Sequence, residues 1–348
     1  MQVPRTPVRV VAAPMAGGPS TPDLAAAVCN AGGLGFLAGG YLRADELAGQ
    51  IRQTVALTGH PFGVNIFVPP PADPLARAWQ VPALARYTER LRDDAASLRV
   101  GLRIPRDDPD EDDTDDWDAK IALVTVQNPV SLVSFTFGCP PPDVVSALHR
   151  VGTAVLVTVT DRDEGAAAVA VGADALVVQG FEAGGHRGTH RVETEPNPFD
   201  HLVLLPMLAD LEVPMIAAGG ITTAGDTRRA LRAGASAVQV GTAFLLTPEA
   251  GTSPAHRMGL SDPHLRSVIT RAFTGRPARG LRNRFVADHD AAVPAVYPGV
   301  DRLTRPLRQA AARRGDLGAV SLWAGSGWQA AAELPAEHVV RRLAGLCD

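Results

Sequence analysis

The feature that most constrains this chain is the regular recurrence of short apolar, β-branched runs with helix-length segments between them. Eight such runs occur, at residues 9–15, 33–39, 62–68, 131–137, 153–159, 174–180, 214–220 and 237–244. Parallel strands that are each followed by a crossover helix produce this alternation. Eight strand–helix units over about 240 residues match the usual size of a (β/α)8 TIM barrel. We therefore expect that fold over residues 1–247, with a doubly wound open sheet as the competing architecture.

Two segments depart from this alternation. An insertion at about 69–122 carries nine acidic residues between Asp107 and Asp118. We expect a solvated loop whose acids lie at the N-terminal end of the next helix, where the helix dipole favours negative charge. A calcium loop would need a glycine at its bend and a closing glutamate, and this segment has neither. Strand alternation also stops after Thr247, so residues 248–348 are expected to form a mostly helical substrate or lid region that packs on the barrel.

Composition and charge exclude several classes of function. The net charge of the 348 residues is only -4, which provides no broad basic field for nucleic acid or an anionic membrane. Cys29, Cys139 and Cys347 have no paired spacing, so neither a disulfide framework nor a metal site is expected. We find no apolar stretch long enough for a membrane helix and no secretory leader, and we expect a cytoplasmic protein.

Glycines follow the last two predicted strands, where a TIM barrel commonly binds phosphate. Gly219 and Gly220 end the seventh run, and Gln239, Val240, Gly241 and Thr242 end the eighth. Glycine lets backbone amides approach phosphate oxygens that a Cβ atom would hold away. Taken alone, the paired glycines are equally consistent with a strand-to-helix turn, but two such loops in the correct strand order favour a phosphate site.

Single polar side chains also end otherwise apolar strands. Asn65 lies in the third run and Gln179 in the sixth, while His186 follows two glycines directly after that sixth run. One buried amide usually satisfies neighbouring backbone, but two at the barrel mouth suggest a ring with several hydrogen-bonding edges. Flavin mononucleotide, FMN, has a phosphate at one end and such a ring at the other. We expect His186 to lie over that ring and to be the catalytic residue, since imidazole exchanges a proton near neutrality.

The chain resembles the nitronate monooxygenase family, formerly called 2-nitropropane dioxygenases, which are FMN-dependent barrels. The resemblance rests on "APMAGGPSTPDLAAAVCNAGG", "PFGVNIFVP", "FTFGCP", "VQGFEAGGHRG", "IAAGGI", "QVGTAFL", "YPGVDRLTRPLR" and "SLWAGSGW". It implies that FMN is held by Met15, Asn65, Gln179, Gly184, Gly219, Gly220, Gln239, Val240, Gly241 and Thr242. It also implies that His186 is catalytic and that Tyr297 contacts the substrate. Ser326 and Asp301 depart from the family pattern, which puts the substrate in question more than the cofactor.

The resemblance implies oxidation of alkyl nitronates, and of neutral nitroalkanes, by O2 to a carbonyl compound and nitrite. The block "EAGGH" is shared with NAD(P)H-dependent flavin reductases, which act on enoyl-acyl carrier proteins or quinones, so a reductase is the alternative. A phosphate-binding barrel without redox activity, or an inactive flavin carrier, is a third class. We expect a small-molecule substrate and a homodimer, no catalytic role for Cys139, and surface positions for His190 and His201. The arginines of residues 271–284 are expected to be structural or to bind a substrate carboxylate.

Overall fold

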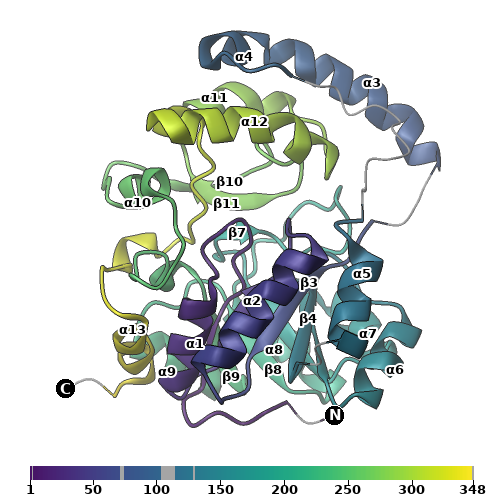
Figure 1. Cartoon of the computed structure of the whole chain (residues 1–348), viewed down its shortest axis with the longest axis vertical. Helices are drawn as coiled ribbons and strands as arrows, with labels where there is room; N and C mark the ends of the chain where they lie inside the picture. The colour runs from purple at the N-terminus through teal and green to yellow at the C-terminus, as the bar shows by residue number, and fades with distance from the viewer. Residues whose placement is uncertain (2, 71–73, 103–113, 128–129, 347–348) are drawn as a thin grey trace.

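Eight parallel strands form a barrel at the centre of the molecule, as expected (Figure 1). This computed structural model describes residues 1, 3–70, 74–102, 114–127 and 130–346. The sheet order is β1-β9-β8-β6-β5-β4-β3-β2, and a parallel bridge between Val11 and Leu34 joins its two ends. The strands are β1 (Val10–Ala12), β2 (Phe36–Ala38), β3 (Gly63–Phe67), β4 (Leu132–Thr136), β5 (Ala154–Val159), β6 (Ala175–Gln179), β8 (Met215–Ala218) and β9 (Ala237–Val240). Each strand lies inside one of the predicted runs.

Alternate residues of these strands face the barrel interior, and their character changes from apolar to polar toward the carboxyl ends. The apolar layer contains residues such as Leu132, Leu156, Val177 and Ile216. The intervening residues pack outward against the helices as a second, larger core. One step beyond the apolar layer, the same strands carry Asn65, Ser134, Thr158 and Gln179. The closed barrel therefore has a polar rim at the carboxyl ends of its strands.

Helices cover the outside of the barrel. They are α1 (Pro22–Asn30), α2 (Ala44–Leu57), α5 (Trp117–Ala122), α6 (Pro142–Arg150), α7 (Arg162–Ala170), α8 (His201–Met207), α9 (Ala224–Arg232) and α13 (Ala336–Ala344). Thr21 caps α1, because its hydroxyl accepts a hydrogen bond of 3.0 Å from the Leu24 amide. The C-terminal helix α13 returns to the barrel and packs against α1 and α9 (Figure 1). No helix among the described residues has the length and apolar character needed to cross a membrane.

A cap covers the polar end of the barrel (Figure 1). It contains α10 (Pro254–Leu260), β10 (Ser267–Thr270), β11 (Ala278–Leu281), α11 (Arg284–His289) and α12 (Gly299–Arg314). β10 and β11 form an antiparallel sheet with β7 (Gly185–His186), a strand that the sequence analysis did not predict. The region after Thr247 therefore combines helices with two strands. We missed these strands because Arg279 and Gly280 interrupt the apolar pattern of β11.

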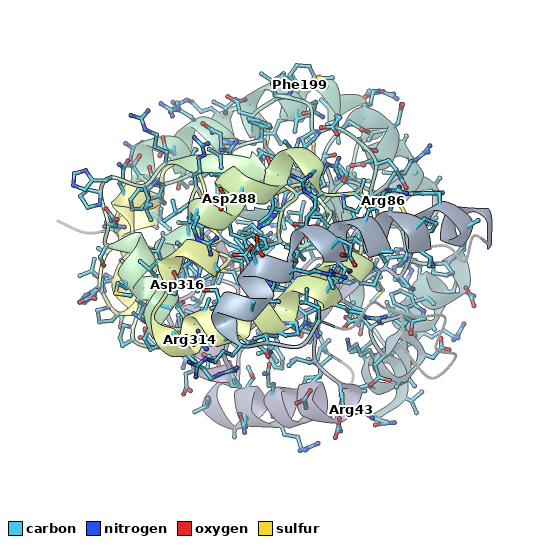
Figure 2. All side chains as sticks on the ribbon, turned by 90° about the horizontal axis from the view of Figure 1, so that it is seen from above. Arg43, Arg86, Phe199, Asp288, Arg314 and Asp316 are labelled. Carbon is cyan, nitrogen blue, oxygen red and sulfur yellow. The ribbon has the colours of Figure 1, made fainter. Side chains whose placement is uncertain are left out.

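Residues 74–102 of the acidic insertion are largely helical, so the prediction of a loop is wrong for this part of it. It forms α3 (Pro74–Arg90) and α4 (Arg92–Leu98), which pack on α12 of the cap. In the view from above, α3, marked by Arg86, and α12, which ends at Arg314, lie on the side of the molecule nearest the viewer (Figure 2). Asp107–Asp113 lie outside the described residues. Asp116 occupies the N-cap of α5, where an acid was expected.

Candidate active site

A cavity of about 620 Å³ lies between the polar rim of the barrel and the cap. Residues at or after the carboxyl ends of β1, β3, β4, β6, β8 and β9 line it, together with residues of α12 and of the segment 320–331. The lining includes the predicted positions Met15, Asn65, Gln179, Gly184, His186, Gly219, Gly220, Gln239, Val240, Gly241 and Thr242. Tyr297 does not line the cavity, but its ring centroid lies 5.9 Å from that of His186. Ligand cavities of about 300–1,000 Å³ are typical of small-molecule sites.

The loop after β8 adopts a conformation that requires glycine. Gly219 and Gly220 have φ angles of 97° and 71°. A Cβ atom on Gly219 would lie 2.8 Å from the amide nitrogen of Ala183, and one on Gly220 would overlap the Glu182 carboxylate. The backbone amides of Gly219, Gly220 and Gly241 donate to no other described residue. Three unpaired N–H groups on neighbouring loops form a concave surface suited to an anion.

Other predicted residues near this loop are engaged in holding the C-terminal segment. The Gly325 amide donates to the Thr242 hydroxyl over 3.0 Å. A Cβ atom on Gly184 would lie 2.5 Å from the same Gly325 nitrogen, so that position also requires the smallest side chain. The segment containing "WAGSG" thus packs directly on the glycine loops, and it brings Trp323 close to His186 at 5.6 Å between ring centroids.

The two rim amides differ in how they are satisfied. The Gln179 amide group donates to the His186 carbonyl over 3.0 Å, and its oxygen accepts from the Gly188 amide over 2.7 Å. Gln179 therefore holds the loop that carries His186. The Asn65 amide nitrogen donates to Ser134 and Thr136, whereas its oxygen Oδ1 has no partner within the described parts of the chain. Asn65 is 3% exposed and lines the cavity. Its Oδ1 is therefore a better acceptor for a ligand than the side-chain oxygen of Gln179, which already accepts a hydrogen bond.

The His186 ring is held between the barrel and the cap. β7 pairs with β11 so that His186 lies opposite Ala278, and His186 Nε2 lies 3.0 Å from Thr274 Oγ1. Aromatic rings surround the imidazole, with centroids at 5.5 Å for Phe137 and 5.6 Å for Trp323. Burial is the main reason that the pKa of His186 is lowered to about 3. Arg276 and Arg308 lower this pKa further and Asp301 raises it, so His186 is a neutral imidazole near neutral pH.

Phe137 is a site residue that the sequence analysis missed, although its motif "FTFGCP" was part of the resemblance. Phe137 follows β4 directly, and its ring packs against His186. Its φ of 78° is unfavourable for an L-residue, as is common at functional sites. The Arg276 guanidinium lies 4.0 Å from the Phe137 centroid and donates to the Thr189 carbonyl. Arg276 is 2% exposed, so this arginine packs against Phe137 in the interior of the protein and not at its surface.

Asp301, Arg305 and Arg308 form an ion cluster on the cavity wall. Asp301 is 1% exposed and accepts from Arg305 at 2.5 Å and from Arg308 at 2.6 Å. Burial would raise the pKa of Asp301, but the two guanidinium groups lower it below its usual value. The carboxylate is therefore neutralised, and the wall as a whole keeps a net positive charge. Asp301 departs from the family pattern, but its pairing with two guanidinium groups means that it does not make the wall repulsive to an anion.

The sequence analysis also made predictions for His201, His190 and Cys139, which lie outside the ion cluster. His201 was expected at the surface, but it is 5% exposed, because it begins α8 beneath the loop of Gly180. His190 is half-buried, and its Nδ1 lies 3.9 Å from Cys139 Sγ. Burial raises the pKa of the Cys139 thiol to about 11, which opposes a nucleophilic role. The described residues contain no cluster of metal-ligating side chains.

Known proteins resemble this chain over almost its full length. A family model described as nitronate monooxygenase matches residues 6–345. A nitronate monooxygenase of Pseudomonas aeruginosa is 41% identical over 344 residues, which cover 96% of this chain and 94% of the relative. One of Paraburkholderia phytofirmans is 37% identical and covers 96% of this chain, with 90% of its own length matched.

Solved structures agree with this result. The nitroalkane oxidase of Streptomyces ansochromogenes superposes with a TM-score of 0.90 and is 46% identical, covering 98% of this chain and 95% of its own. FabK of Thermotoga maritima has a TM-score of 0.71 and 25% identity, with coverages of 97% and 92%. The family model, the relatives and the shared fold together show that this chain belongs to the nitronate monooxygenase family.

Proposed function

We propose that this protein is an FMN-dependent oxidoreductase that oxidises alkyl nitronates, and neutral nitroalkanes, with O2 to a carbonyl compound and nitrite. The observation that supports it most is a neutral His186 on the wall of a cavity that also carries unpaired backbone amides for a phosphate. Family membership supports the same reaction, since the relatives above are named for nitronate or nitroalkane oxidation.

The residues present fit FMN. The amides of Gly219, Gly220 and Gly241 would bind its phosphate, because they are unpaired and the glycine backbone allows close approach. Asn65 would accept a hydrogen bond from the ring through Oδ1, its unpaired oxygen. Gln179, whose amide is already engaged by the His186 loop, would contact the flavin only while keeping those bonds. We retain Met15, Gly184, Gln239, Val240 and Thr242 as contacts because they line the same cavity.

The chemistry divides between the cofactor and the chain. Bound FMN supplies the electron acceptor. His186, as a neutral imidazole, accepts the proton from the carbon next to the nitro group of a neutral nitroalkane. The resulting imidazolium is stabilised by the adjacent nitronate anion, which raises the pKa of the ring because opposite charges favour the charged form. The positive wall formed by Arg305 and Arg308 favours retention of the anion.

Anaerobic mixing tests the proposal. The purified flavoprotein is mixed with ethyl nitronate in one experiment and with NADH or NADPH in another, while the flavin absorbance is followed. We expect the nitronate to reduce the flavin, so that the absorbance of the oxidised flavin falls rapidly. When air is admitted, nitrite should form and oxygen should be consumed. Bleaching by NAD(P)H alone would instead establish the flavin reductase suggested by the shared "EAGGH" block. A protein that purifies without flavin and binds none on reconstitution would contradict both.

Three further expectations belong to this proposal. O2 as the oxidant is measured by oxygen uptake, and a homodimer is measured by the mass of the protein in solution. A reducing, cytoplasmic setting is consistent with Cys29 and Cys139, which are both free thiols.

A further inference from the structure

Besides the catalytic histidine, the Thr274 hydroxyl has two backbone partners. These two partners determine the direction in which the hydroxyl proton points. Thr274 is 1% exposed and lies in the tight turn that precedes β11. Its Oγ1 lies 3.0 Å from His186 Nε2 and 3.2 Å from the carbonyl oxygen of Arg276. The backbone amide of Arg276 points to the same oxygen at 3.4 Å.

A hydroxyl group has one proton to donate and two lone pairs that accept. The Arg276 carbonyl can only accept, so the Thr274 proton goes to it. The Arg276 amide can only donate, and it occupies one lone pair of Oγ1. The remaining lone pair faces His186 Nε2, which must then carry a proton in order to donate to it.

The opposite arrangement leaves a buried group unpaired. If the Thr274 hydroxyl donated to a bare Nε2, the Arg276 carbonyl would have no donor among the described residues. An unpaired carbonyl in a buried turn is unfavourable because it loses water without gaining a partner. Backbone pairing of His186 with Ala278, and the bond from Gln179 to the His186 carbonyl, keep the ring beside this turn.

We infer that Thr274 fixes the His186 imidazole as the Nε2–H tautomer and thereby makes Nδ1 the basic nitrogen that faces the cavity. Nδ1 has no hydrogen-bond partner within the described residues and is not among their fully buried unpaired atoms, so it keeps accessible surface on a residue that lines the cavity. Thr274 is in this sense a positioning residue. The tautomer is a property of the resting protein, whereas its role in proton removal rests on the function proposed above.

Nitrogen-15 NMR of the full, flavin-loaded chain with labelled histidine tests the tautomer directly. The His186 signals are identified as those lost in His186→Asn, and the protonated and bare ring nitrogens differ widely in chemical shift. We expect a bare Nδ1 and a protonated Nε2 in the wild type and in Thr274→Ser, which keeps the hydroxyl. Thr274→Val should shift the population toward Nδ1–H. A wild-type His186 with its proton on Nδ1, or a tautomer unchanged in Thr274→Val, would overturn the inference.

Steady-state rates provide the second measurement. In Thr274→Val, kcat for a neutral nitroalkane should fall about 10- to 100-fold, a part of the effect of a positioned base. KM should stay nearly constant, and Thr274→Ser should restore the rate. Thr304→Val is the matched control, since it removes another fully buried hydroxyl of the cap, one that binds the Phe273 carbonyl and does not touch His186. If Thr274→Val and Thr304→Val lost activity equally, Thr274 would have only a structural role. The NMR measurement does not require turnover. It can therefore overturn the tautomer assignment even if the proposed oxidation is correct, and it can confirm the tautomer even if the proposed oxidation is wrong.

Discussion

At the scale of single residues, the site combines a neutral base with fixed positive charge. His186 contacts aromatic rings on several sides, and the charged groups that shift its pKa are Asp301, Arg276 and Arg308. The two arginines and burial all oppose protonation of the imidazole, and only Asp301 favours it. The ring can therefore remain a proton acceptor over a wide range of pH.

This environment predicts an unusual pH profile. Because the pKa of His186 is lowered to about 3, the base stays unprotonated as the pH falls. We expect kcat/KM for a neutral nitroalkane to remain flat from about pH 8 to about pH 5, where an ordinary histidine with a pKa of about 6.5 would lose activity. A fall centred near pH 6.5 that disappears in His186→Asn would contradict the account.

The same lowered pKa has a consequence for stability. The unfolded chain binds a proton at His186 below about pH 6.5, whereas the folded chain does so only near its pKa of about 3. Between these values the unfolded state holds more protons, so stability decreases as the pH falls. His186→Asn should lose less unfolding free energy than the wild type between about pH 6.5 and about pH 4. Urea titrations at both pH values measure this difference, and equal losses would contradict it.

Asp301 gives another prediction at this scale. In Asp301→Asn the two arginines of the cavity wall lose their buried counter-ion, so the free energy of unfolding should fall by about 3–5 kcal/mol. Asp210→Asn is the control, because its pair with Arg162 is exposed and should contribute little. Urea denaturation of both variants measures the difference. Equal stability of the two variants would show that Asp301 is not held as its contacts indicate.

The sequence identified the residues at strand ends better than the residues around them. Asn65 lies within a predictable strand, His186 and the paired glycines come after two others, and the mouth of a barrel brings strand ends together. Thr274, Arg276 and Trp323 come from the cap, and their positions depend on how β11 pairs with β7. Nothing in the local sequence determines that pairing.

At the scale of elements, the two glycine loops are the parts most specialised for a ligand. The loop after β8 has positive φ angles and no space for a Cβ atom, while α9 directly behind it is capped by its own residues. Asp226 accepts from the amides of Thr222 and Thr223, which leaves the glycine amides as the free donors. We expect this loop to determine how firmly FMN is retained.

Gly219→Val tests that role. The added side chain would meet the Ala183 backbone at 2.8 Å and would strain a φ of 97°. The ratio of flavin to protein absorbance after purification should fall well below that of the wild type. Gly225→Ala is the control, since a Cβ atom there makes only an ordinary contact of 3.4 Å with Thr223. A Gly219→Val protein that folds and keeps its full flavin content would exclude this loop as the phosphate site.

Helices and strands were predictable from the sequence where the spacing of apolar residues was the strongest signal in the segment. All eight barrel strands lie in the expected runs, but the insertion was interpreted from its acidic residues alone. Leu84, Tyr87, Leu91, Ala95 and Leu98 are buried at spacings of three and four residues, which is the pattern of an amphipathic helix. That signal was present in the sequence and marks the face that packs on the cap. The internal Pro82 of α3 obscured it.

At the scale of the whole molecule, the cap is built from segments far apart in the chain. Helix α4 joins it through a cluster in which the buried Asp94 accepts from the half-exposed Arg284 and pairs with the buried His289, each at 2.7 Å. Arg314 at the end of α12 also donates to the carbonyls of Ser97 and Leu98. Asp94 therefore connects the insertion to the region that covers the cavity.

Removing this connection should loosen the insertion before the barrel. In Asp94→Ala the half-exposed Arg284 and the buried His289 lose their hydrogen-bond acceptor, which costs about 1–3 kcal/mol of unfolding free energy. Hydrogen exchange should accelerate in α3, α4 and α11 more than in the barrel strands. Asp93→Ala, at an exposed position of the same helix, should leave the exchange unchanged. Uniform acceleration throughout the chain in Asp94→Ala would show that the cap and barrel open as one unit.

The central claim is that His186 removes a proton in a cavity that binds FMN independently of it. The most direct measurement compares wild-type and His186→Asn rates on a neutral nitroalkane and on the preformed nitronate, with oxygen saturating and flavin content determined. We predict that the variant keeps its flavin and loses about 10²- to 10⁴-fold in rate on the nitroalkane. It should retain far more activity on the nitronate, which has no proton to remove. Undiminished rates on both substrates in the flavin-loaded variant would contradict the account.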